Sequence, residues 1–275
     1  MADHQLVATF MFYQGYCSKC GHDHVIQTFR NNGSDMVVAV GGGKIMDLCK
    51  YVAATLCCPL ITIPTSVATC AAWTPFSVLY TQQGIPIGSV HHTQGVNLCI
   101  ADYDVLTKEP NRLLAAGMVD SLAKEQELIC GASNMDLQPG QSGLYAAYQL
   151  SKVIKAVTMQ QGVDAWQCVS KHTCNAALLD IFYSNLALTG MCSGLAQGTK
   201  QLALAHAVNN GLRTLHPQFM RDVLHGESVG IGIVVQQAYN GTTASDYLSL
   251  CNKLSMPVCL KDIQYPIDQD TFSFL

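Results

Sequence analysis

The chain of 275 residues is 49% hydrophobic and only 12% charged, with a formal net charge of -4. It therefore offers no basic surface to nucleic acid or to an anionic membrane, and none of its apolar runs approaches the roughly 20 residues that span a bilayer. Because a typical domain carries about 25% charged residues, the low content indicates burial within the fold or between subunits. We expect a homo-oligomer that acts on small molecules.

The N-terminal segment MADHQLVATFMFYQ contains an acid and no basic cluster, so it is unlike a signal peptide, and we expect a cytoplasmic protein. The thirteen cysteines are an odd number, and most fall within apolar stripes, which is typical of reduced thiols. Cys17 and Cys20, followed by His22 and His24, offer the ligands of a zinc knuckle. The pairs lie too close for a zinc finger, so the alternative of a turn leading into a helix over 24–30 is favoured.

The first hundred residues alternate between the sequence pattern of β-strands and that of amphipathic helices. Strands are predicted over 6–13, 36–40 and 59–63 and near 97–101, and helices near 22–31 and over 44–56. The run at 36–40 is apolar and rich in β-branched residues, which is typical of a strand buried on both faces. This alternation predicts a parallel sheet with helices on both faces.

A run of three glycines at 41–43, followed by Lys44, joins the strand at 36–40 to the helix at 44–56. Glycine lets a ligand approach the backbone closely, and the start of the helix offers unpaired N–H groups to an anion such as phosphate. The sequence of this turn matches neither the Walker A motif nor the G-x-G-x-x-G fingerprint. A tight strand-to-helix turn that binds no ligand therefore remains the alternative.

From residue 110 onward, helical patterns follow one another over 111–131, 142–161, 171–190, 196–210 and 219–239. We therefore predict an α/β domain over residues 1–109 and an all-helical domain over residues 110–275.

Three residues of the helical part could carry chemistry. Asp120 falls on a packing face of its helix, where a buried carboxylate needs a partner, and Lys124 one turn later is the structural candidate. His206 and His225, taken singly, are each consistent with a hydrogen-bonded core histidine. Together, one carboxylate and two imidazoles suit a catalytic metal that keeps one coordination position open.

Five motifs occur together in one order: GGGKIMDLCK, PTSVATCAAWTPFSVLY, GMVDSLAKEQE, HAVNNGL and HGESVGIG. In this order they resemble the glycerol dehydrogenase-like branch of the iron-containing alcohol dehydrogenase superfamily, close to the 2-hydroxycarboxylate dehydrogenase type. The resemblance implies an N-terminal Rossmann-like parallel-sheet domain followed by an all-α domain, an architecture shared with dehydroquinate synthase. It also implies NAD or NADP in the cleft between them.

By matched position, the resemblance implies that Asp120, His206 and His225 hold one divalent metal, with zinc first and iron or nickel as alternatives. The implied activity is hydride transfer between a small alcohol, either a 2-hydroxy acid or a polyol, and its carbonyl compound. The positions that would line the dinucleotide are Gly42, Gly43, Lys44, Asp47, Thr65, Ser66, Ala68, Thr74, Phe76 and Tyr80.

Two positions near the expected substrate depart from glycerol dehydrogenases. Cys70 stands where those enzymes have an aspartate that contacts the polyol, and Asn209 stands where they have a second histidine. A thiol is a poor acceptor for a hydroxyl group, whereas Lys124, Asn209 and Arg213 lie on helices expected to carry metal ligands. We therefore expect small 2-hydroxy or 2-oxo acids to be turned over better than glycerol.

The resemblance covers residues 36 to about 240, and the chain looks truncated at both ends relative to the family. Two alternatives follow. The chain could be a catalytically silent or weakened relative that acts as a binding module, or a lyase like dehydroquinate synthase that uses NAD only transiently.

Overall fold

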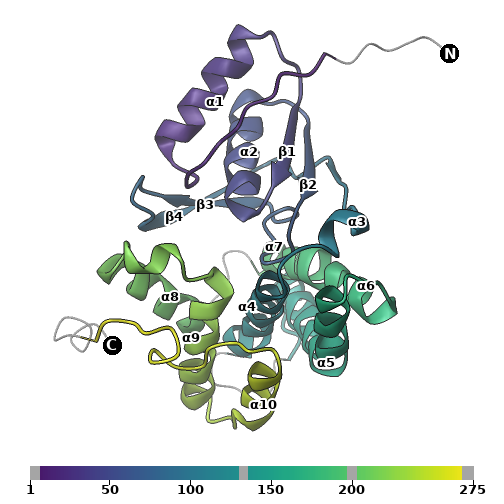
Figure 1. Cartoon of the computed structure of the whole chain (residues 1–275), viewed down its shortest axis with the longest axis vertical. Coiled ribbons are helices and arrows are strands. Elements are labelled where there is room, and N and C mark those ends of the chain that lie inside the picture. The colour runs from purple at the N-terminus through teal and green to yellow at the C-terminus, as the bar shows by residue number, and fades with distance from the viewer. Residues whose placement is uncertain (1–6, 130–135, 197–202, 268–275) are drawn as a thin grey trace.

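A computed structural model describes residues 7–129, 136–196 and 203–267 of the chain. Parts of three predicted elements lie outside these ranges: residue 6 of the strand predicted over 6–13, residues 130–131 of the helix over 111–131, and residues 197–202 of the helix over 196–210. Figure 1 shows an α/β half built from the N-terminal part of the chain and a helical half built from the rest. The two halves meet along the β3–β4 hairpin and the upper end of helix α4.

The main sheet has three parallel strands in the order β1 (Val37–Gly41), β2 (Leu60–Pro64) and β5 (Leu98–Cys99). The register pairs Val37 with Leu60 and Ile61 with Leu98. Helix α2 (Gly43–Leu56) makes the crossover from β1 to β2. The predicted strand, glycine turn, helix and strand over 36–63 are thus confirmed to within a residue or two.

Helix α1 (Lys19–Asn31) starts at the N-cap Ser18, whose side chain accepts a hydrogen bond from the backbone of Gly21, and it packs beside α2 (Figure 1). The prediction of a strand over 6–13 is wrong, because residues 7–13 pair with no strand of the described chain. A chain with the β pattern still needs a neighbouring edge for its hydrogen bonds, and this segment does not lie along one.

One face of the sheet is open to solvent. Along β1, Val37 and Ala39 are buried in the core, whereas Val38 and Val40 are 48% and 57% exposed. The prediction of a strand buried on both faces is therefore wrong for β1. Strand side chains alternate between faces, and the described helices α1 and α2 lie on one side of the sheet only.

A second, antiparallel sheet is formed by β3 (Phe76–Tyr80) and β4 (Pro86–His91), a hairpin that the sequence patterns did not predict. Ser77 anchors the hairpin to α2, because its buried hydroxyl donates to the carbonyl of Asp47 at 2.7 Å and contacts His92 Nε2 at 2.8 Å. The hairpin lies between the sheet and helix α8 of the helical half (Figure 1).

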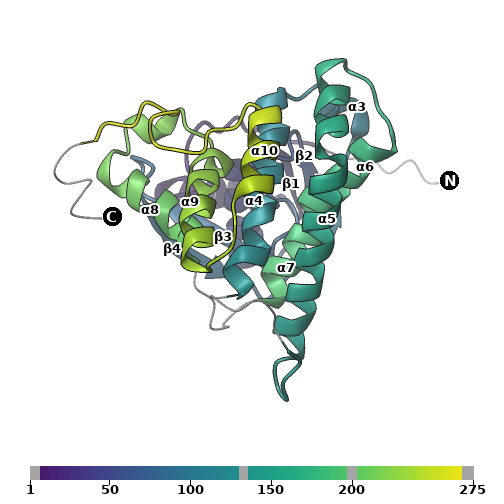
Figure 2. The same cartoon turned by 90° about the horizontal axis from the view of Figure 1, so that it is seen from below.

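The helical half is centred on α4 (Asn111–Ile129), which packs against α5 (Ser142–Ser170) and α9 (His225–Tyr239), as Figure 2 shows from below. Helix α8 (Leu204–Leu215) packs on α9. The remaining elements are α3 (Tyr103–Leu106), α6 (Ala176–Tyr183), α7 (Thr189–Leu195), a 3-10 turn at Phe219–Arg221 and α10 (Ser245–Lys253). Among the described residues, none of these helices combines the length and hydrophobicity needed to cross a bilayer.

Several predicted helices have different bounds in the structure. The helix predicted over 142–161 continues to Ser170, and the helix predicted over 196–210 lies over Leu204–Leu215. The helix predicted over 219–239 begins only at His225, because the 3-10 turn and a short loop precede it. The helix predicted over 171–190 starts at Ala176, after the N-cap Asn175, whose side chain accepts from the backbone of Leu178. It continues through a π-helical turn, Ser184–Leu188, into α7.

Both backbone hydrogen-bonding groups of Val67 are bound by side chains from other parts of the chain. The N–H of Val67, in the loop after β2, donates to Glu109 Oε2 at 3.0 Å, and its carbonyl accepts from Asn185 Nδ2 at 3.3 Å. Gly117 of α4 allows this close approach, since a Cβ there would lie 2.0 Å from the carbonyl oxygen of Val67. The helical half therefore holds this loop through Asn185 and the close contact at Gly117, while Glu109, just before that half, binds the N–H.

Candidate active site

A cavity of about 820 Å³ lies between the α/β half and the helical half. Its walls come from the glycine turn, the loop after β2, the β3–β4 hairpin and helices α4, α7, α8 and α9. All ten residues matched to the dinucleotide line this cavity, and so do Cys70, Lys124, Asp120, His206 and His225. Asn209 is not among the lining residues.

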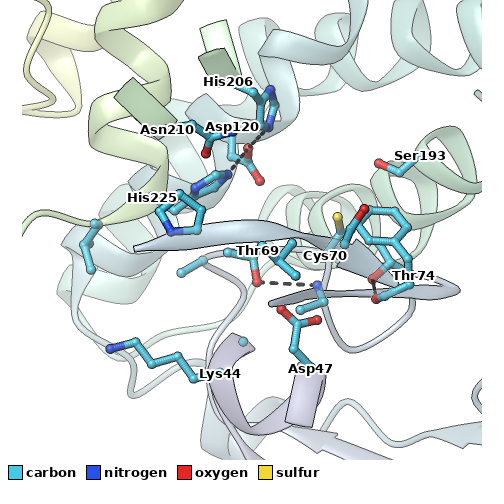
Figure 3. A pocket seen from close by; sticks show the side chains of 18 of the residues that line it. Lys44, Asp47, Thr69, Cys70, Thr74, Asp120, Ser193, His206, Asn210 and His225 are labelled. Carbon is cyan, nitrogen blue, oxygen red and sulfur yellow. Dashed lines mark hydrogen bonds and ion pairs between the residues drawn. The ribbon is translucent and has the colours of Figure 1, made fainter. Parts of the chain in front are cut away.

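Asp120, His206 and His225 come from α4, α8 and the first turn of α9, and their side chains point toward one another in Figure 3. The Nε2 atoms of both histidines lie 3.4 Å from Asp120 Oδ1. One potential ligand atom from each of the three residues can be chosen so that all lie within 4.8 Å of one another. Within the described part of the chain, this is the one cluster of its kind.

Two observations test whether these residues fit a metal ion. Asp120 Oδ1 is buried and has no hydrogen-bond partner of good geometry in the described chain, so the histidine contacts do not satisfy it. His206 Nδ1 contacts both carboxylate oxygens of Glu127, at 2.8 and 2.9 Å, and its backbone N–H donates to Glu127 at 3.0 Å. A carboxylate on the far nitrogen fixes the ring and leaves Nε2 to ligate, so the donor set fits a metal.

The charges at this cluster favour a cation between the carboxylates. Burial alone would lower the pKa of His206, but Glu127 and Asp120 raise it to about 9. Burial alone would raise the pKa of Asp120, yet His225 and His206 hold it well below its usual range. The carboxylates of Asp120 and Glu127 thus stabilise positive charge between them. A divalent ion bound there would supply such a charge.

The glycine turn lies at the opposite end of the cavity, beside Lys44 (Figure 3). Helix α2 starts at the N-cap Gly42 without a side-chain cap, so its first N–H groups are available to a ligand. A Cβ on Gly43 would lie 2.8 Å from Thr69 Oγ1, so glycine lets the helix start approach the loop after β2. This arrangement suits a phosphate group against backbone.

Basic side chains surround this end of the cavity. The Lys44 ammonium lies 4.0 Å from the centre of the Tyr16 ring, and burial together with Arg213 and Arg221 lowers its pKa. Arg213 is itself held by the helical half, because it donates to the carbonyls of Met220 and Val223. The local excess of positive charge favours an anionic ligand.

Asp47 and Thr74 line the cavity, and both also contact the buried Lys50 beneath it. Asp47 Oδ1 pairs with Lys50 Nζ at 3.0 Å, and Lys50 donates to Thr74 Oγ1 at 2.7 Å and to the carbonyl of Phe76. Lys50 is 4% exposed, so this network ties α2 to the start of β3 in the protein interior. This network therefore fixes the shape of the cavity near the glycine turn.

The candidate substrate residues differ in their surroundings. Cys70 is 8% exposed, and burial raises the pKa of its thiol to about 11, so it is neutral at physiological pH. Asn209 is 1% exposed, and its Oδ1 accepts from Arg213 Nε at 3.0 Å and from Ser228 Oγ at 2.6 Å. Its amide oxygen is thus engaged between α8 and α9, while the adjacent Asn210 lines the cavity.

The candidate zinc knuckle is not assembled. Cys17 is buried, and burial raises the pKa of its thiol to about 12, whereas Cys20 is exposed on α1. His22 Nε2 bonds Thr55 Oγ1 at 2.8 Å, and its ring stacks on Tyr51. The favoured interpretation, a turn into a helix, is confirmed, with α1 running from Lys19 to Asn31.

A sequence profile of the family "iron-containing alcohol dehydrogenase" matches residues 2–103, which include the glycine turn. The chain is a relative of the iron-containing alcohol dehydrogenases. Hydroxycarboxylate dehydrogenase A from Escherichia coli K12 is 29% identical over 95% of this chain and 71% of its own length. Glycerol dehydrogenase from Thermotoga maritima is 31% identical over 84% of this chain and 63% of its own length.

Solved structures of iron-containing alcohol dehydrogenases and their relatives show the same fold. The crystal structure of a probable glycerol dehydrogenase from Sinorhizobium meliloti 1021 superposes with a TM-score of 0.81 at 22% identity. The match covers 95% of this chain and 72% of that one. The predicted architecture, a parallel-sheet part followed by a helical part, is thus confirmed, and the chain spans about two thirds of the length of such relatives.

Several cavity residues were not predicted from the motifs of the iron-containing alcohol dehydrogenase family. Glu127 could have been found, because it follows Asp120 and Lys124 at the i+7 and i+3 positions of one helix face. Ser193 of α7 and Arg221 carry no sequence signal that separates them from ordinary helix and loop residues.

Proposed function

We propose that this chain is a metal-dependent, NAD- or NADP-linked oxidoreductase that interconverts a small alcohol and its carbonyl compound. The observation that carries the proposal is the convergence of Asp120, His206 and His225 on the cavity that also holds the glycine turn. A site for hydride transfer needs a group that polarises the substrate oxygen next to a nicotinamide, and one cavity offers room for both.

Asp120, His206 and His225 would hold a single divalent ion. Their nitrogen and oxygen donors favour zinc, with iron or nickel as the alternatives. When bound, this ion supplies Lewis acidity toward the substrate oxygen, and the dinucleotide accepts or gives the hydride. Glu127 would keep the His206 ring oriented, and the glycine turn with Lys44 would hold the phosphates of the dinucleotide.

The remaining parts of the proposal concern the whole protein. We place the boundary between a dinucleotide-binding domain and a metal- and substrate-binding domain at residue 109, just before α4. The low content of charged residues, 12%, supports a homo-oligomer. The unpaired cysteines of the described chain support a reducing compartment such as the cytoplasm.

Three measurements on the wild type and on Asp120→Ala and His206→Ala test the proposal. Metal content by mass spectrometry should fall in both variants, and alcohol-dependent NADH production should disappear. NADH binding, followed by its fluorescence, should remain, because the glycine turn lies at the other end of the cavity. Asp104→Ala, at an exposed residue of α3, serves as the control and should change none of these.

Each alternative predicts a different outcome. A wild type that binds NADH and metal but oxidises no alcohol in a screen of polyols and 2-hydroxy acids would favour a binding module. Chemistry on a substrate without net NADH production would favour a lyase. A fully active Asp120→Ala and His206→Ala double variant would refute the proposed site.

A further inference from the structure

The Lys124 ammonium lines the cavity near the metal cluster, where the carboxylates of Asp120 and Glu127 act on it through space without a direct contact. Within the described chain it makes neither a hydrogen bond nor an ion pair. Lys50, a buried lysine nearby, has Asp47 and three oxygen acceptors. The N–H donors of Lys124 are thus uncommitted within the described chain, and an anionic ligand in the cavity could accept from them.

The acidic groups nearest to Lys124 are already engaged with the histidines. Asp120 contacts both His206 and His225, and Glu127 holds the Nδ1 side of His206. On the proposed function, a divalent ion joins this cluster. The two carboxylates, the ammonium and the ion then leave a surplus of one positive charge, which an anionic substrate would neutralise and a neutral polyol would not.

A neutral hydrogen-bond donor lies on the same side of the cavity. The Oγ atom of Ser193, on α7, is buried and has no hydrogen-bond partner of good geometry in the described chain. It lies beside the Cys70 thiol, which in turn lies within electrostatic reach of Lys124 (Figure 3). An ammonium and a hydroxyl, both with free donors, are the groups that a carboxylate accepts from.

We propose that Lys124 and Ser193 form a subsite for the carboxylate of a small 2-hydroxy or 2-oxo acid, next to the metal cluster. The proposal rests on the proposed function and assigns its substrate class. Lys124 follows Asp120 by one turn of α4 and therefore lies on the same helix face. This spacing suits a substrate whose carboxylate and reacting oxygen sit on adjacent carbons.

The test compares two alcohols with one carbon skeleton, 2-hydroxybutyrate and 1,2-butanediol, oxidised under one condition by the metal-loaded protein. The wild type should favour 2-hydroxybutyrate in kcat/KM. Lys124→Met should lower this preference at least about 10-fold, mostly through KM, because it removes a charge-assisted hydrogen bond. Lys124→Arg should keep part of the preference, and Ser193→Ala should lower it by a few fold.

The matched control is Lys155→Met on α5, which removes a lysine that pairs with Glu125 outside the cavity. It should leave the preference unchanged. A wild type that prefers 1,2-butanediol would overturn the subsite. So would Lys124→Met if it slows both alcohols equally, since Lys124 would then act only as a structural charge.

A binding measurement separates this proposal from the proposed function. Oxamate, a carboxylate that resembles a 2-oxo acid, is titrated calorimetrically into the wild type, Lys124→Met and Lys155→Met. At least about 10-fold weaker binding to Lys124→Met alone would support the subsite even if neither alcohol is oxidised. Equal binding to all three proteins would overturn it, while failure to oxidise any alcohol with oxamate binding intact would count against the proposed function only.

Discussion

Glu109 is a buried carboxyl group at the junction of the two halves, and we expect it to make stability depend on pH. Its side chain is 4% exposed, Oε2 accepts from the Val67 N–H at 3.0 Å, and Oε1 has no partner in the described chain. Burial raises its pKa from 4.5 to about 8. The native state therefore keeps a proton on Glu109 that the unfolded chain releases near pH 4.5.

The direction of the effect follows from this difference in proton binding. Between pH 4.5 and 8 the native state holds more protons than the unfolded state, so the free energy of unfolding falls as pH rises. The contribution of Glu109 is fully present below pH 4.5 and is lost as pH rises through 8. At about 1.4 kcal/mol per pH unit, the loss between pH 5 and pH 8 is roughly 3 kcal/mol.

Glu109→Gln isolates this contribution, because glutamine keeps the acceptor for Val67 but carries no titrating proton. Urea unfolding of both proteins at pH 5, 6, 7 and 8 gives the difference in free energy at each pH. This difference should grow in favour of the variant by roughly 3 kcal/mol over the range. For Asp104→Asn, at an exposed carboxyl group, the difference in the free energy of unfolding from the wild type should not depend on pH. Parallel pH profiles for the wild type and Glu109→Gln would refute the reasoning.

Three further predictions follow from individual contacts. Glu127→Gln should weaken metal binding about 10- to 100-fold by loosening His206, as measured by competition with a chelator, and unchanged affinity would contradict this role. Gly226→Ala would place a Cβ 1.9 Å from the carbonyl oxygen of Ala116, so guanidinium unfolding should show a loss of about 2 kcal/mol or more, and wild-type stability would show that α4 and α9 can separate there. Lys50→Met leaves a buried carboxylate unpaired and should cost about 3 to 5 kcal/mol in the same assay, whereas a neutral effect would mean that water replaces the ammonium.

The part of the cavity proposed to bind the dinucleotide was predictable because its signal is local. The change from a strand pattern to a helix pattern around the glycines at 41–43 identifies β1, the turn and α2 without tertiary information. The exposed face of β1 was not predictable, since Val38 and Val40 are the same residue type as the buried Val37. Apolar character alone does not show whether a second layer of helices is present.

The convergence of the candidate ligands could not be derived from spacing, because Asp120 and His206 are 86 positions apart and their helices meet only in the folded chain. The family resemblance supplied that step. The hairpin of β3 and β4, over Phe76–His91, was missed because its strands are short and it is held by a hydrogen bond from the Ser77 side chain to α2. Asn209 was assigned to substrate on its position in a motif, whereas its amide oxygen is used by Arg213 and Ser228.

Because of the π-helical turn at Ser184–Leu188, the cavity wall formed by α7 depends on the number of residues in the preceding helix as well as on their types. A π turn holds one more residue than an α turn, so it shifts the phase of everything that follows by about 100°. Asn185, near the start of the turn, donates to the Val67 carbonyl, and Ser193, which follows the turn, lines the cavity. Deleting one residue from the turn would leave a regular helix, but it would rotate Ser193 away from the cavity. Among related sequences, a gap at this position therefore signals a different substrate wall even where every aligned residue is identical.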